Sequence, residues 1–159
     1  MTIQPHDNIS EETIRVWLNE FLGIFGWDVQ NTNQVLQEHV LQGAYRQRLN
    51  EIQSTHRRPD YILKNGTNIK SFLDAKSLDV DIFTDGDAAF QIRSYGWSAQ
   101  SPCAFISNFE QFVICDTRFT PNPSQPANMG AIQLSVDEYI EQFDVLFSHL
   151  WRQSVCSNQ

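Results

Sequence analysis

The chain has 159 residues and a mass of 18.4 kDa, which suits one domain with a single hydrophobic core. Hydrophobic residues make up 41% and aromatic residues 12%, so the composition excludes a disordered chain. The formal net charge of -8 is a poor match for a protein that grips DNA by itself, because non-specific DNA affinity comes largely from lysine and arginine. A protein of this charge that acted on DNA would need a partner to supply the grip.

The sequence carries no signature of a membrane segment, a signal peptide or a disulfide framework. Residues 1–12 are polar, and no apolar run approaches the roughly 18 residues of a membrane span. We therefore expect a cytoplasmic protein with no membrane contact. The three cysteines, Cys103, Cys115 and Cys156, lack the C-x-x-C spacing of zinc sites, so we expect buried or incidental thiols.

An amphipathic helix is predicted from Ser10 to Phe25. Its apolar residues recur at the i, i+3, i+4, i+7 spacing of one helical face and are Ile14, Trp17, Leu18, Phe21, Leu22 and Phe25. Asn8 or Ser10 can cap the start and Gly26 can end the helix. Glutamates in a first turn ordinarily serve the helix dipole and solvation.

Residues 31–56 carry a weaker pattern. Val35 and Leu36 fit either a helix or a strand, and the polar stretch 42–55 fits a loop or a loop with a helix. Such an insertion is usually solvated, although its length allows it to approach a substrate.

A β-hairpin is predicted around Asn65-Gly66, because both residue types accept the positive φ of a tight turn. Pro59 cannot donate to a strand ladder and suits the start of the first strand. Asp60 and Asp74 then lie on adjacent antiparallel strands. Since side chains alternate along a strand, Asp74 and Lys76 point to the same face and Ala75 points into the packed side.

The second half of the chain predicts a helix at 87–99, in which Gln91 and Tyr95 share a face. Strands are expected at 103–107, 112–115 and 131–134, with a loop at 119–130. The helix before residue 103 permits a crossover with parallel pairing.

The S-x-x-E pattern of Ser135 and Glu138 predicts a capped last helix, which runs to Trp151 with a wide apolar face. Residues 153–159 read as a polar, frayed tail after a core at about 10–152. These elements predict a mixed α/β fold, a central mixed β-sheet flanked by helices, in a single domain over 1–159.

The hairpin gathers three charged groups that suit phosphodiester hydrolysis. That reaction needs neutralised phosphoryl oxygens and a deprotonated water placed in line, both of which Mg²⁺ can supply. Asp60 and Asp74 are suitable oxygen ligands, with the backbone carbonyl of Ala75 as a third, and Mn²⁺ can substitute. Lys76 can sit beside the attacking water and stabilise hydroxide. The pattern predicts a metal-dependent nuclease.

Other side chains can support this chemistry. One glutamate of the first helix can complete the acidic cluster, Glu12 in preference to Glu11. Gln91 and Tyr95 can hydrogen-bond to Lys76 or to a phosphate and fix its direction. Arg58 is a further candidate for DNA contact.

Each feature alone also has an ordinary structural explanation. An Asp followed two residues later by a Lys is usually a surface ion pair. Four further acids lack the spacing of a Ca²⁺ loop, so loop solvation and helix capping are expected for Asp79, Asp81, Asp85 and Asp87. The combination of both strands with the following helix favours the catalytic interpretation.

At these residues the sequence resembles the PD-(D/E)xK nuclease superfamily. More narrowly, it is similar to the N-terminal nuclease domain of type I restriction R subunits and of fused type IIG restriction-modification polypeptides. The matching segments are Glu12 with the helix that ends at 25–28, then 58–61, 72–76, 80–82, 89–99 and 105–118. The family often has Glu where this chain has Asp74, and either carboxylate can ligate Mg²⁺.

The resemblance implies a restriction-endonuclease-like core and a Mg²⁺-dependent endonuclease domain of a restriction system. It assigns metal binding and catalysis to Asp60, Asp74 and Lys76. Double-stranded DNA is the implied substrate, and methyltransferase, specificity or helicase domains or subunits supply targeting. One site per chain implies a transient homodimer. The alternatives are a catalytically silent DNA-binding or assembly module, or a nuclease acting on RNA or single strands.

Overall fold

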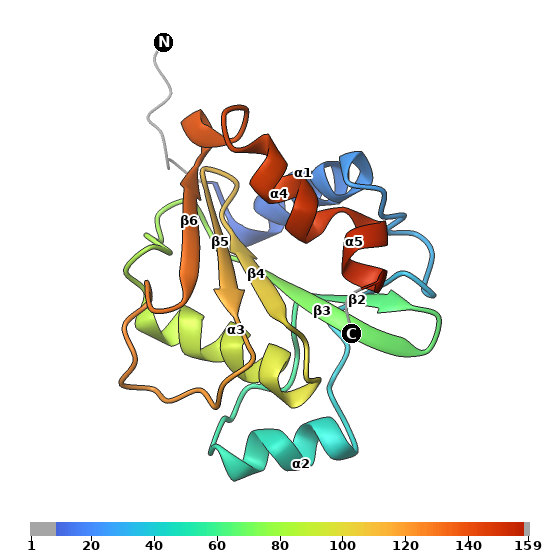
Figure 1. Ribbon diagram of the computed structural model, residues 1–159, viewed down its shortest axis with the longest axis vertical. Helices are drawn as coiled ribbons and strands as arrows, with labels where there is room; N and C mark the ends of the chain where they lie inside the picture. Colours follow the sequence, from blue (N-terminus) through green and yellow to red (C-terminus); the bar gives the residue numbers. More distant parts are fainter. Residues whose placement is uncertain (1–8, 158–159) are drawn as a thin grey trace.

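The computed structural model describes residues 9–157, which form one six-stranded sheet flanked by helices (Figure 1). The strands are β1 (Val35–Gln37), β2 (Tyr61–Asn65), β3 (Asn68–Ala75), β4 (Cys103–Ser107), β5 (Gln111–Asp116) and β6 (Ala131–Ser135). The helices are α1 (Glu11–Ile24), α2 (Ala44–Glu51), α3 (Gly86–Ser98), the 3₁₀ turn η1 (Val136–Glu138), α4 (Phe143–Leu150) and α5 (Arg152–Ser157).

The sheet is mixed, and the spatial order of its strands follows the sequence from β1 to β6. All neighbouring strands pair antiparallel except β3 and β4, which pair parallel with Asp74 opposite Ile106. Helix α3 makes the crossover that a parallel pair requires. The predicted mixed α/β fold is confirmed, and the arrangement is consistent with a restriction-endonuclease-like core.

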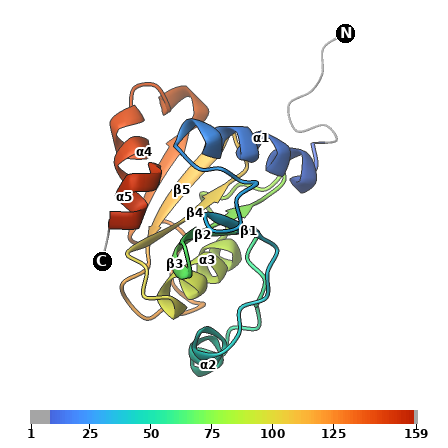
Figure 2. The same cartoon turned by 90° about the vertical axis from the view of Figure 1, so that its right-hand side faces the viewer.

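The helices cover the two faces of the sheet in separate layers (Figure 2). Side chains alternate along each strand, so Leu73 faces the layer of α1, α4 and α5, while Phe72 faces α3. Helix α2 packs Leu49 into the α3 layer. The central strands are buried on both faces, and their sequences are therefore continuous apolar stretches, as in β5.

Helix α1 follows the predicted pattern. The Ser10 hydroxyl accepts a hydrogen bond from the backbone N–H of Thr13 at 3.3 Å. Ile14, Leu18 and Leu22 form its buried stripe. The predicted helix is confirmed.

The β2–β3 turn differs from the expected one by one residue. Asn65 belongs to β2 and pairs with Asn68, so the turn residues are Gly66 and Thr67. Gly66 takes the positive φ of +65°, whereas Asn65 does not. A register shift between Leu63 and Lys64 changes the pairing along the ladder so that it closes with a two-residue turn.

The expected single C-terminal helix is wrong, since the chain breaks into η1, α4 and α5. Trp151 is extended at φ -53° and ψ 130°. The carbonyl of Leu150, which a continuous helix would use for its next turn, accepts a 2.9 Å hydrogen bond from Trp27 Nε1. The backbone N–H of Arg152 donates to the Phe25 carbonyl at 2.9 Å. Contacts with the distant N-terminal segment therefore end α4.

The expectation of a frayed tail from residue 153 is also wrong for the part of the tail that the structure describes. Residues 152–157 form α5, whose Val155 is 4% exposed and packs into the α1 layer. The three cysteines are free, with Cys115 buried and Cys103 and Cys156 half-buried, as expected from their spacing.

Two helical glycines give a matched test of this packing. A Cβ on Gly96 of α3 would lie 2.4 Å from Thr117 Cγ2, whereas a Cβ on Gly23 of α1 would meet nothing within 4 Å. We expect Gly96→Ala to destabilise the fold by about 1–3 kcal/mol through overpacking. Gly23→Ala should stabilise it by up to about 1 kcal/mol through helix propensity. Urea unfolding measures both, and equal effects of the two variants would contradict the tight α3 contact.

Candidate active site

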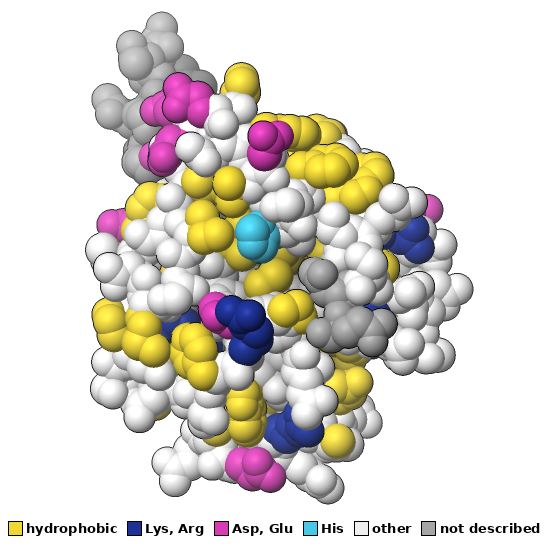
Figure 3. Space-filling view, in the orientation of Figure 1, with side chains coloured by type: hydrophobic (Ala, Val, Ile, Leu, Met, Phe, Trp, Pro, Cys, Tyr) yellow, Lys and Arg dark blue, Asp and Glu magenta, His cyan; other side chains and the backbone are white. Residues whose placement is uncertain are grey.

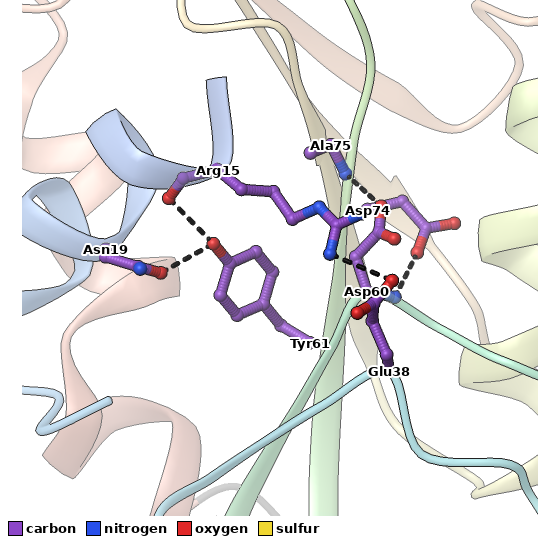
Figure 4. A network of polar contacts seen from close by, with 7 residues as sticks. All are labelled: Arg15, Asn19, Glu38, Asp60, Tyr61, Asp74 and Ala75. Carbon is purple, nitrogen blue, oxygen red and sulfur yellow. Dashed lines mark hydrogen bonds and ion pairs between the residues drawn. The ribbon is translucent and has the colours of Figure 1, made fainter. Parts of the chain in front are cut away.

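Two carboxylates face each other at one end of the β2–β3 hairpin. Tyr61 pairs with Leu73, so the continued ladder places Asp60 opposite Asp74. The backbone N–H of Asp60 donates to Asp74 Oδ1 at 3.1 Å, and the backbone N–H of Ala75 donates to Asp60 Oδ2 at 2.7 Å (Figure 4). Each carboxylate is thus fixed through one oxygen by the backbone beside the other.

Asp74 is buried and Asp60 is half-buried, and this makes the charge of both carboxylates costly. Asp74 is 2% exposed, and its Oδ2 atom has no hydrogen-bond partner among the described residues. Burial, followed by the charge of Asp60, raises the pKa of Asp74 to about 7. Burial also raises the pKa of Asp60. An ionised Asp74 therefore has one buried oxygen that no described residue neutralises, and such an oxygen is a suitable ligand for a cation.

Lys76 lies on the α3 side of this pair. Its backbone N–H donates to the Ser107 carbonyl at 3.0 Å, which ties the end of β3 to β4. Its Nζ atom lies 3.5 Å from Gln91 Oε1, and Gln91 Nε2 lies 3.3 Å from the hydroxyl of Tyr95. The structure therefore brings Lys76, Gln91 and Tyr95 into one chain of polar contacts.

Tyr95 anchors that chain. It is 1% exposed, and burial raises the pKa of its hydroxyl, so the group stays neutral. The hydroxyl also accepts a hydrogen bond from the backbone N–H of Arg58. Tyr95 thereby links α3 to the segment that leads into Asp60, while the side chain of Arg58 remains exposed.

The helix glutamate at the acidic pair is Glu11 rather than Glu12. Glu11 is half-buried, and burial followed by the charge of Asp60 raises its pKa. Glu12 is exposed. One residue turns a helix by about 100°, so the buried stripe of Ile14, Leu18 and Leu22 places Glu11, and not Glu12, on the packed side of α1. Ser10 is the observed N-cap.

Sequence reasoning missed two residues of the site, Arg15 and Glu38. Arg15 Nη1 lies 3.0 Å from Glu38 Oε1, and the Arg15 charge opposes the rise in the pKa of Asp60 (Figure 4). The backbone N–H of Glu38 donates to the Asp60 carbonyl at 3.0 Å, with Glu38 at φ +56°. Glu11 and Arg15 are four residues apart, and this helical spacing was the available signal.

Tyr61 sets the position of α1 against the hairpin. It is fully buried, and its hydroxyl lies 2.9 Å from the Arg15 carbonyl and 2.6 Å from Asn19 Oδ1 (Figure 4). Tyr61 directly follows Asp60 in the chain. The orientation of Arg15 toward the acidic pair therefore depends on this contact.

The acids after Lys76 shape the loop that leads into α3. Asp85 caps α3 by accepting the backbone N–H of Ala88 at 3.0 Å. Asp81 accepts the backbone N–H of Phe83 at 3.1 Å and Gln111 Nε2 at 2.9 Å. These contacts are loop structure and helix capping, as expected.

The donor set of the site suits a hard divalent cation. Among residues 9–157, no group of three histidine, cysteine, aspartate or glutamate side chains is arranged to hold a metal. A metal here would use Asp60, Asp74 and a backbone carbonyl, with water completing its shell. Mg²⁺ characteristically binds through one or two carboxylates and retains several waters. The unpartnered Asp74 Oδ2 fits this requirement.

The chain is similar to part of a restriction-modification protein. It is 30% identical over 145 residues to the type II restriction enzyme and methyltransferase RM.Eco57I of Escherichia coli. The match covers 87% of this chain but only 14% of the relative. No family model and no solved structure matches the chain. In the described part of the chain, no helix is long and apolar enough to cross a membrane.

The buried acid predicts a pH-dependent difference in stability. The pKa of Asp74 rises from 3.8 to about 7 on folding, so its contribution favours folding at low pH and is lost as the pH rises through 7. Asp74→Asn cannot ionise and keeps an oxygen for the Asp60 N–H. In EDTA at pH 8 we expect its Tm to exceed that of the unmodified chain by roughly 5 °C.

The melting temperatures of Asp74→Asn and of the unmodified chain should converge as the pH falls below the folded pKa of Asp74, which is about 7. Exposed Asp79 gives the control, since Asp79→Asn removes a charge outside the pair. Thermal melts followed by circular dichroism measure the difference. A constant difference between Asp74→Asn and the unmodified chain at every pH would contradict the raised pKa.

Proposed function

We propose that this chain is a metal-dependent DNA endonuclease domain of a restriction system, with a site of the PD-(D/E)xK kind. The observation that carries the proposal is the Asp60–Asp74 pair, in which buried Asp74 keeps one unpartnered carboxylate oxygen and feels the charge of Lys76. The similarity to a restriction enzyme and methyltransferase supports the same assignment.

In this proposal Asp60, Asp74 and the carbonyl of Ala75 hold Mg²⁺, for which Mn²⁺ can substitute. The N–H of Ala75 points toward Asp60, and in an extended strand the carbonyl of the same residue points the same way. The bound metal would neutralise phosphoryl charge and lower the pKa of the attacking water.

The residues around the metal act on the water and the phosphate. Lys76 holds the attacking water and stabilises the negative charge that develops. Gln91, held by Tyr95, orients the Lys76 ammonium. Glu11 adds a carboxylate from α1, and the exposed Arg58 side chain contacts the DNA backbone.

Targeting comes from other domains or subunits in this proposal. A net charge of -8 opposes unaided binding to double-stranded DNA. The relative joins a restriction enzyme to a methyltransferase, and this chain spans 14% of its length. Methyltransferase, specificity or helicase parts would deliver the DNA, and two copies of the site would pair transiently to cut both strands.

Substitutions at the site should separate catalysis from folding. Asp74→Ala and Lys76→Ala should each lower the rate of plasmid cleavage with Mg²⁺ by at least about 100-fold, because each removes a group that acts on the transition state. Lys70→Ala is the matched control, since Lys70 lies on the same strand away from the acidic pair. Agarose gels of supercoiled plasmid at a high ratio of protein to DNA measure the rate.

Cleavage that survives Asp74→Ala or Lys76→Ala would refute the assignment of these residues. In the same assay, double-strand breaks should rise more than linearly with protein concentration if two copies pair. A linear rise would remove the homodimer from the proposal.

Metal binding distinguishes this proposal from a catalytically silent module of the same fold. Calorimetric titration with Mn²⁺ should show a site in the unmodified chain, with affinity at least about 10-fold weaker in Asp74→Asn. Lys76→Ala should retain binding, because Lys76 is not a ligand, while it loses cleavage. If the unmodified chain bound neither Mn²⁺ nor Mg²⁺, the silent DNA-binding or assembly module would be the better account.

A further inference from the structure

An apolar surface lies open on the outer side of α1 and the segment that follows β6. Several of its side chains are unusually exposed for their type, including Ile140 at 89% and Ile24 at 68%. We call it the α1–α4 face, and it comprises Val16, Trp17, Phe21 and Ile24 of α1, Phe109 of the β4–β5 turn, and Ile140, Phe143 and Phe147. Figure 3 shows hydrophobic side chains gathered over this region in the upper part of the molecule.

Aromatic rings link the parts of the face, with the buried ring of Phe25 joining Phe21 of α1 to Phe143 of α4. Trp17 contacts Phe109 with ring centroids 5.5 Å apart, and Phe25 contacts Phe143 at 5.8 Å. Phe143 in turn contacts Phe147 at 5.8 Å. At the α1 end the rings border a groove of about 340 Å³, which is lined by Trp17, Glu20, Phe21, Ile24 and Phe109. Grooves of this kind accept the apolar side chains of a helix.

Acidic side chains predominate around the face. The two sequence stretches that supply most of it, 16–45 and 119–151, contain no lysine or arginine. Exposed acids border it, and Glu20, Glu141 and Asp144 form no ion pair with any residue of the described range 9–157. Arg152 stands at one end, after the stacked rings of Phe147 and Trp151.

We propose that the α1–α4 face docks a partner polypeptide through an amphipathic helix whose apolar side is flanked by lysine and arginine. Apolar anchors would fill the groove and basic flanks would meet the acidic border, which matches both features of the face. A second copy of this chain fits poorly, because a two-fold contact would bring like-charged borders together. The inference is independent of the nuclease assignment, since it uses none of the site residues.

A synthetic amphipathic helix of leucine and lysine is the probe, with a leucine and glutamate helix as its charge-reversed counterpart. Trp17 lies in the groove, so tryptophan fluorescence together with calorimetry reports binding. We expect the lysine peptide to bind and Ile24→Asp or Phe147→Asp to weaken it by about 10-fold or more. Val40→Asp is the control, since Val40 is 42% exposed but lies outside the face.

Charge reversal tests the acidic border separately. Glu20→Lys should weaken the lysine peptide and strengthen the glutamate peptide, each by several-fold. Circular dichroism melts of every variant confirm folding, which these exposed positions should tolerate.

Three outcomes would overturn the proposal. The first is no binding of the lysine peptide, and the second is an equal loss with Val40→Asp. The third is self-association in sedimentation runs that Ile24→Asp abolishes, which would assign the face to a second copy of the chain.

Discussion

The reciprocal hydrogen bonding of Asp60 and Asp74 is the constraint on which the rest of the site depends. Two carboxylates that face each other in a buried position repel, and burial disfavours the charge of both. Backbone N–H groups on the facing strands hold one oxygen of each, at 3.1 Å and 2.7 Å. The hairpin therefore fixes an unfavourable pair of charges in one geometry. A divalent cation bound by both carboxylates would offset their repulsion and the cost of burying their charge. The electrostatic cost of the pair is thus connected with the metal binding proposed for it.

The surrounding elements each secure one group of the site to this hairpin. Tyr61 ties α1 to β2 and so brings Glu11 and Arg15 to the acidic pair. Tyr95 ties α3 to the segment before Asp60. The β4–β5 turn secures the remaining end, because the Ser107 carbonyl accepts the Lys76 N–H and Asn108 Nδ2 donates to the Val80 carbonyl at 2.8 Å. Three layers of the fold thus converge on the last residues of β3.

The parts of the fold that local sequence determines were predictable, and those set by distant contacts were not. The Asn65-Gly66 pair between two apolar runs identified the hairpin that places Asp60 opposite Asp74, and the four-residue spacing of Gln91 and Tyr95 placed both on one side of α3. The preference for Glu12 overlooked a signal in the sequence, because Glu11 stands three residues before Ile14 and so shares the buried face of α1. The break after Leu150 arises from a hydrogen bond to Trp27, 123 residues away, and no local pattern reports such a contact. Glu38 directly follows β1, a strand of three residues that is too short for a periodicity signal.

The distribution of charge explains how an acidic chain could act on DNA. The cations whose charges act on the acidic pair are Arg15 and Lys76, and Arg15 is already engaged by Glu38. Few cations therefore remain to hold a phosphate backbone, while the α1–α4 face carries apolar and acidic side chains (Figure 3). A basic partner on that face would reduce the long-range repulsion between this chain and DNA without contacting the site. The proposed cleavage would then depend on the partner both to select the DNA site and to reduce the repulsion between the acidic chain and DNA. The free chain would act weakly on DNA.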